Sequence, residues 1–219
     1  MTKNNRGFTV VLTAAVILLI LSASIAAPIL CRPFYYAHIT AMDLPERTGY
    51  TAEEIRAAYD EMLDFCVYGT EFGTGVLPWS EEGKAHFADC AVLFRLDFTV
   101  LAVSGAVLLV CLVLYRRGLR PAKLLGRGPL FWSGSIPIVV FAVIAALAAM
   151  DFDRAFVVFH KLFFPGKDNW IFDAETDAII NVLPEAFFRN CAILIVALLF
   201  LACILLLVLD ARSRKRITA

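Results

Sequence analysis

The side chains best suited to moving a proton are the three histidines, His38, His86 and His160. Imidazole has an ordinary pKa close to neutral, so it can both accept and donate a proton. Asp89 follows His86 by three residues, and in a helix a carboxylate at that spacing is close enough to orient one ring nitrogen. These residue types indicate general acid–base chemistry. An ordinary polar role at a helix end is the alternative.

The segment 155–188, which contains His160, is dense in aromatic and acidic side chains. It holds seven phenylalanines and five acidic residues and lies between two apolar runs. Phenylalanine rings near His160 would exclude water and so favour the neutral, basic imidazole. Aromatic side chains also suit the boundary between membrane and water. We therefore expect 155–188 to form an ordered, functional surface at the boundary between membrane and water rather than a linker between two spans.

Several other polar residues could support the histidines or bind a substrate. The alternative roles are helix caps, surface ion pairs and interfacial anchors; Asp173, for example, could cap a short helix. These supporting candidates are Asp89, Asn169, Trp170, Asp173, Asp177, Glu185 and Arg189.

The sequence does not indicate a metal site or a cofactor. Two histidines are too few for a closed metal site, which usually takes three or four ligands, and no CxxC spacing is present. Cys66 and Cys90 both fall in a segment that we expect to be outside the cell, where disulfides form. From the sequence, Cys66 and Cys90 can either form a disulfide or remain two free thiols.

The elements that must position these residues belong to a membrane protein. The chain has 219 residues, of which 60% are hydrophobic and only 18% are charged, and its net charge is zero. A helix needs about 20 apolar residues to cross a bilayer core roughly 30 Å thick. Four runs meet that need, at residues 8–30, 98–115, 130–150 and 191–209. They predict one integral membrane domain, and the absence of a basic excess argues against nucleic acid as a partner.

The basic residues predict the orientation of the four spans. The loop 116–129 carries five basic residues and no acid, and the N-terminus and the tail beyond the last span are also basic. Every acidic residue except Asp210 lies in 31–97 or 151–190. Because cytoplasmic loops are enriched in lysine and arginine, both termini should be cytoplasmic and the two acidic segments outside.

The two outer segments, 31–97 and 151–190, are each small for an independent core, so we expect them to pack together. The fold class predicted is thus an all-α membrane protein with four transmembrane helices and a small, mainly helical extracytoplasmic cap. In this cap His86 and His160 should lie within roughly 8 Å of each other, near enough to share one bound group.

Local signals place the helices of the cap. Thr51 and Glu54 have the spacing of a capping box, and Ser80 can cap a helix that runs without a break into the second span. Residues 154–163 can extend the third span until Pro165 and Gly166 end it, and Pro184 suits the first turn of the helix leading into the fourth.

Several short motifs resemble a bacterial family of four-span membrane proteins that includes the lipoprotein intramolecular transacylase, Lit. The motifs are Tyr50-Thr51-x-x-Glu54, Glu82-x-x-x-His86-x-x-Asp89, Phe159-His160-x-Leu162-Phe163-Phe164-x-Gly166, Trp170-x-Phe172, Asp177 and Leu183-Pro184-Glu185-x-Phe187-Phe188. One residue departs from this resemblance, since a small aliphatic side chain would be expected where Cys90 stands.

The resemblance implies an enzyme of the bacterial cell membrane whose active site faces outward. Such enzymes move an acyl chain from the diacylglyceryl group of a lipoprotein to the amine of its N-terminal cysteine, which leaves a lyso-form lipoprotein. The two suspected catalytic histidines of the family match His86 and His160. The implied partners are membrane lipids and diacylglyceryl-modified lipoproteins; the oligomeric state is not specified.

Two other classes of function remain open at this point. One is a non-catalytic membrane protein, such as a sensor or a factor for envelope assembly. The other is a metal or haem binder that uses His86 and His160 together with Asp89. A transporter is disfavoured, because the spans carry no internal charge and no paired broken helices.

Overall fold

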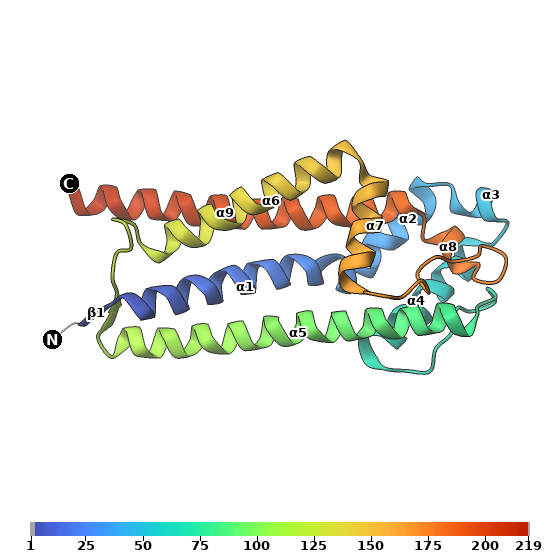
Figure 1. Ribbon diagram of the computed structural model, residues 1–219, viewed down its shortest axis with the longest axis horizontal. Coiled ribbons are helices and arrows are strands. Elements are labelled where there is room, and N and C mark those ends of the chain that lie inside the picture. Colours follow the sequence, from blue (N-terminus) through green and yellow to red (C-terminus); the bar gives the residue numbers. More distant parts are fainter. Residues whose placement is uncertain (1–2, 219) are drawn as a thin grey trace. The chain divides into compact units, whose positions relative to one another are not determined.

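The structure is a computed structural model that describes residues 3–218, and most of them are helical (Figure 1). The helices are α1 (Arg6–Leu30), α2 (Arg32–Ala41), α3 (Leu44–Thr48), α4 (Ala52–Tyr68), α5 (Glu81–Arg116), α6 (Pro129–Met150), α7 (Phe152–Phe163), α8 (Ile179–Val182) and α9 (Glu185–Thr218). Two short strands, β1 (Lys3–Asn5) and β2 (Leu119–Pro121), pair in parallel.

The chain divides into two compact units. The spanning unit comprises the described residues of Met1–Ile25, Asp97–Leu147 and Leu194–Ala219. The cap unit comprises Ala26–Leu96 and Ala148–Ile193, and it contains all but Asp97 of the two segments that were expected to pack together. That expectation is confirmed.

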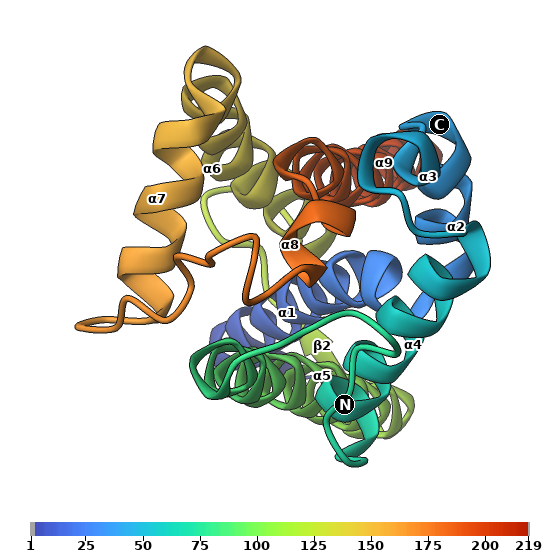
Figure 2. The ribbon, with the colours of Figure 1, turned by 90° about the vertical axis from the view of Figure 1, so that its right-hand side faces the viewer.

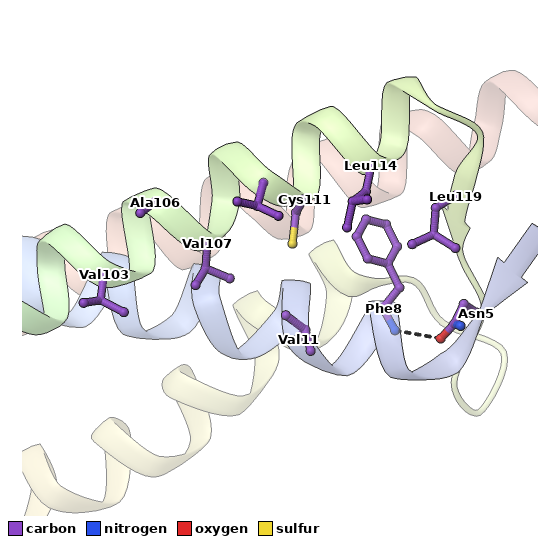
Figure 3. Close-up of a pocket in the computed structure, with 10 residues that line it drawn as sticks. Asn5, Phe8, Val11, Val103, Ala106, Val107, Cys111, Leu114 and Leu119 are labelled. Atoms are coloured by element: carbon purple, nitrogen blue, oxygen red, sulfur yellow. Dashed lines mark hydrogen bonds between the residues drawn. The ribbon is translucent and has the colours of Figure 1, made fainter.

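Four helices, α1, α5, α6 and α9, are long and apolar enough to cross a membrane. The prediction of a multi-pass, all-α membrane protein is thereby confirmed. Within the spanning unit α6 and α9 approach closely at Gly134, where an added Cβ would lie 2.8 Å from the Cys203 carbonyl oxygen. Between α1 and α5 lies an apolar groove of about 450 Å³, lined by side chains such as Phe8, Val107 and Cys111 (Figure 3).

The core of the cap unit joins its two segments. The helices α2, α3 and α4 pack on one another (Figure 2), and α8 packs on α3 and α4. The ring of Tyr35 stacks on Tyr59 with centroids 3.8 Å apart, and its hydroxyl donates a hydrogen bond of 2.8 Å to the Val182 carbonyl. This buried contact connects residues 147 positions apart in the chain.

The local helix signals in the first segment are confirmed. At the start of α4, the Thr51 hydroxyl accepts from the Glu54 amide while the Glu54 carboxylate accepts from the Thr51 amide. The Ser80 hydroxyl accepts from the Gly83 amide at 3.0 Å, so Ser80 caps α5. From Glu81 the helix α5 continues without a break to Arg116, as predicted.

Two expectations for the second segment are wrong. α7 does not extend the third span, because Asp151 adopts an extended backbone and caps a new helix by accepting from the Arg154 amide at 2.9 Å. Asp173 caps no helix: its carboxylate accepts from the Glu175 amide in a turn, and α8 begins only at Ile179. In both cases an aspartate satisfies nearby backbone amides in a way that apolar patterning does not predict.

Candidate active site

His86 on α5 and His160 on α7 lie together in the cap unit. Their ring centroids are 5.8 Å apart with the ring planes tilted by 32°, within the roughly 8 Å expected. Both side chains are buried, with exposed fractions of 6% and 7%. The structure therefore brings together two residues that are far apart in the sequence and places them in a setting with little water.

His160 is held by its own helix and by aromatic rings. Its Nδ1 lies 2.8 Å from the carbonyl oxygen of Phe156, one turn earlier on α7. A carbonyl can only accept, so Nδ1 carries the proton and the neutral ring has its lone pair on Nε2. Trp170 stacks on the imidazole with centroids 4.5 Å apart. Burial lowers the pKa of His160, which favours this neutral form.

His86 is enclosed by a second set of rings. Phe164 and Phe172 meet it edge-on, with centroid distances of 5.0 and 5.4 Å. Burial, assisted by the neighbouring His160, lowers the pKa of His86 to about 4. Its Nε2 lies 3.5 Å from the Cys90 sulfur, whereas its Nδ1 is buried and has no hydrogen-bond partner among residues 3–218. His86 is thus a neutral ring with one nitrogen unused.

Asp89 does not orient His86, contrary to the expectation from its i+3 spacing. Its carboxylate accepts from the Lys167 ammonium at 2.5 Å and from the Asn169 amide at 3.2 Å. Burial opposes ionisation, but these hydrogen bonds hold the pKa of Asp89 below its ordinary value. A charged ammonium is a stronger partner for a carboxylate than a neutral ring. Asp89 therefore anchors the loop after α7 to α5.

Asp177 forms a second anchor for the same loop. Its carboxylate accepts from both the amide and the hydroxyl of Ser80, at 2.8 and 2.7 Å, and is almost fully buried. A small pocket beside it is lined in part by Gly83, Asn169 and Phe172. The Asn169 side-chain oxygen is buried and has no partner among the described residues. The two aspartates thus fix the loop that carries Asn169 and Trp170.

The family model for the lipoprotein intramolecular transacylase Lit matches residues 10–188. The chain belongs to the Lit family. The solved structure of Lit from Bacillus cereus is 24% identical, covers 98% of each chain and has a TM-score of 0.85. Two structures of that protein with one histidine replaced, by arginine or by alanine, have TM-scores of 0.79 and cover 94% and 96% of their own chains. No curated relative matches.

This family match confirms the resemblance that the motifs indicated. Of the remaining candidate residues in the described part of the chain, Trp170 contacts the histidine pair, whereas Asp173, Glu185 and Arg189 do not. The Trp170 indole donates to the Lys167 carbonyl at 3.0 Å while stacking on His160. Glu185 pairs with the Asp153 carboxyl; burial and this hydrogen bond raise the pKa of Glu185. No ring contact or hydrogen bond described here joins Asp173, Glu185 or Arg189 to either histidine.

His38 differs from the other two histidines in this Lit-family chain. Its Nδ1 donates to the Phe34 carbonyl at 2.6 Å, and its Nε2 accepts from the Asn190 amide at 3.0 Å. Both ring nitrogens are therefore occupied by the fold. This is the pattern of a structural histidine.

Sequence reasoning missed four contributors to the site of this Lit-family chain. Cys90 touches His86, and the Phe156 carbonyl orients His160; the i+4 spacing of each pair was a signal that could have revealed them. Lys167 and Gly83 gave no local signal, because their partners lie far along the chain.

No disulfide joins Cys66 and Cys90, and all six cysteines within the described residues are free. The Cys66 thiol donates instead to the Phe87 carbonyl, with the sulfur 3.5 Å from the oxygen. Across residues 3–218, no group of three or more histidine, cysteine, aspartate or glutamate side chains is arranged to hold a metal ion.

Proposed function

We propose that this Lit-family chain is an intramolecular acyltransferase that acts on diacylglyceryl-modified lipoproteins in the bacterial cell membrane. It moves one acyl chain from the glyceryl group to the amine of the N-terminal cysteine. The observation that supports this activity best is the buried pair His86 and His160, with ring centroids 5.8 Å apart. Both rings are neutral near neutral pH, since the pKa of each is lowered.

The reaction matches what two neutral imidazoles can do. The amine nitrogen attacks the ester carbonyl carbon, a C–N bond forms, and the C–O bond to the glyceryl group breaks. The nitrogen must lose one proton and the glyceryl oxygen must gain one, so atoms and charge balance without a cofactor. One imidazole takes the first proton while the other assists the leaving oxygen, and each such role contributes about 10²–10⁴-fold to the rate.

The aromatic enclosure supports transfer over hydrolysis. Water inside the site would compete with the amine for the ester and release a free fatty acid. Trp170, Phe164 and Phe172 surround the two imidazoles and limit the access of water. The substrate amine then meets the ester in a site from which the competing nucleophile is excluded.

We further propose that the histidine pair faces the outside of the cell and that both termini are cytoplasmic. The basic loop after α5 and the basic tail support this orientation. A reporter domain fused after Ala219 should behave as cytoplasmic, and one inserted in the loop 69–78 should be accessible from outside. A fusion after Ala219 that reads as external would overturn the orientation.

The activity is tested by producing the protein in bacteria that make only diacylglyceryl lipoproteins. The N-terminal lipopeptides of a defined lipoprotein are then analysed by mass spectrometry. The expected product carries an acyl chain on the cysteine nitrogen and lacks one chain on the glyceryl group. Unchanged diacylglyceryl peptides, with the protein correctly inserted in the membrane, would instead support a non-catalytic role in envelope assembly or sensing.

A further inference from the structure

The two histidines of the site differ in the partners of their ring nitrogens. His160 donates from Nδ1 to the Phe156 carbonyl, which leaves a lone pair on Nε2. His86 has no such carbonyl contact among residues 3–218. Its only hydrogen-bond partner there is the Cys90 sulfur, 3.5 Å from Nε2, so the position of its proton depends on this thiol.

The thiol of Cys90 is suited to donate rather than to accept. Burial raises the pKa of Cys90 above its ordinary range, so the sulfur carries a proton at neutral pH. An imidazole nitrogen with a lone pair is a good acceptor, whereas sulfur is a weak one. Cys90 also follows His86 by four residues on α5, which keeps the two side chains on one face of the helix.

We propose that Cys90 is a positioning residue that donates its S–H to Nε2 of His86 and so keeps the proton of the neutral ring on Nδ1. The second observation behind this proposal is the Nδ1 atom itself, which is buried and unpartnered in a side chain only 6% exposed. A buried N–H without a partner is costly unless a bound group accepts from it. The two rings then present complementary groups, a lone pair on His160 and an N–H on His86.

This inference rests on the proposed acyl transfer for its catalytic meaning and assigns a different role to each histidine. Nε2 of His160 removes a proton from the amine as the C–N bond forms. Nδ1–H of His86 donates a hydrogen bond to the ester carbonyl oxygen, on which negative charge develops as the amine attacks. A neutral imidazole can act in this way. The proton held by His160 then passes to the glyceryl oxygen as the C–O bond breaks.

The position of the proton is measured by nitrogen-15 NMR on the full-length chain, labelled at its histidines and placed in lipid bilayers at neutral pH. The His86 signals are assigned by their absence from His86→Gln. In the unmodified protein, all three rings should carry the proton on Nδ1, because His38 and His160 donate from Nδ1 to carbonyls. In Cys90→Ala only the His86 signals should change, toward the form protonated on Nε2.

The matched control is Cys66→Ala, which removes a buried thiol of the same unit that donates to the Phe87 carbonyl. It should leave the His86 signals unchanged. Protonation of His86 on Nε2 in the unmodified protein would overturn the proposal. The same conclusion would follow if His86 in Cys90→Ala kept its proton on Nδ1.

An activity measurement separates this inference from the proposed function. Cys90→Ala should lower kcat roughly 10- to 100-fold with KM nearly unchanged, by analogy with the loss seen when a group that orients a metal-bound histidine is removed. If the unmodified protein forms no lyso-form product although its NMR spectrum shows the Nδ1 proton, the proposed function fails and the role of Cys90 stands. If the unmodified protein forms the lyso-form product but His86 is protonated on Nε2, the proposed function stands and the role of Cys90 fails.

Discussion

Asp177 occupies the space that a side chain at Gly83 would need. A Cβ added to Gly83 would lie 2.1 Å from one carboxylate oxygen of Asp177, closer than any side chain permits. The same carboxylate binds Ser80, the cap of α5, and Gly83 lies less than one turn before His86. The glycine thus allows the loop after α7 to reach the start of the helix that carries His86.

Replacing Gly83 by alanine should therefore displace Asp177. We expect a destabilisation of about 1–3 kcal/mol, as is usual for overpacking, and a loss of most activity. Thermal unfolding in detergent and the lipopeptide mass spectrum measure the two effects. Gly105→Ala, also on α5, is the matched control, because its Cβ would lie 3.8 Å from the nearest atom, a Leu19 methyl. Equal stability and equal activity of the Gly83→Ala and Gly105→Ala variants would contradict a close contact between Gly83 and Asp177.

Removing either histidine of the pair should abolish most activity without preventing membrane insertion. His86→Ala and His160→Ala should each lower the rate by at least about 10²-fold, and the double variant should be little worse, since the residues act as a unit. His38→Ala, whose ring serves the fold, should keep most activity. Full product from inserted His160→Ala would refute the catalytic role of that ring.

The ion pair between Asp89 and Lys167 should matter for the loop more than for the chemistry. Its side chains are 22% and 49% exposed, so the pair should contribute only about 0.2–1 kcal/mol. Lys167→Met should raise KM several-fold by loosening the loop that holds Asn169, and it should leave kcat nearly unchanged. Lys84→Met, which breaks the exposed pair with Glu81, serves as the control. A large fall in kcat for Lys167→Met would argue for a direct role of the ammonium.

The pH dependence of stability should report the burial of His86. Its pKa in the folded protein is about 4, compared with 6.5 for an ordinary histidine. Between these values the unfolded chain binds a proton at His86 that the folded protein does not. The free energy of unfolding should therefore fall as the pH drops through this window, by about 3 kcal/mol at most. The free energy of unfolding of the protein and of His86→Gln is measured at intervals from pH 7 to pH 4. The two pH dependences should diverge in this window, and parallel pH dependences would be inconsistent with a buried neutral ring.

Local patterns predicted much of this fold, because their physical causes are local. The length of the apolar runs predicts α1, α5, α6 and α9, and the capping box of Thr51 and Glu54 predicts the start of α4. The break at Asp151 was missed because a short charged stretch between two apolar ones, here Asp151, Asp153 and Arg154, can equally lie on the exposed face of one longer helix.

The candidate site was predictable in part. The proximity of His86 and His160 followed from the expectation that the two outer segments pack together, and it is confirmed. The partner of Asp89 was not predictable, since Lys167 lies 78 residues further along the chain and competes with the nearby ring. Spacing along a helix shows which side chains can meet, whereas the tertiary fold decides which of them do.

Because Trp170 stacks on His160, the fluorescence of this tryptophan can report on the protonation of the histidine. An indole in contact with an imidazole fluoresces less when the imidazole is protonated, and these two rings are 4.5 Å apart at their centroids. The emission of Trp170 should therefore follow the charge on His160. With Trp79 and Trp132 replaced by phenylalanine, the remaining signal would let the proton on the proposed base be followed in real time, without a labelled substrate.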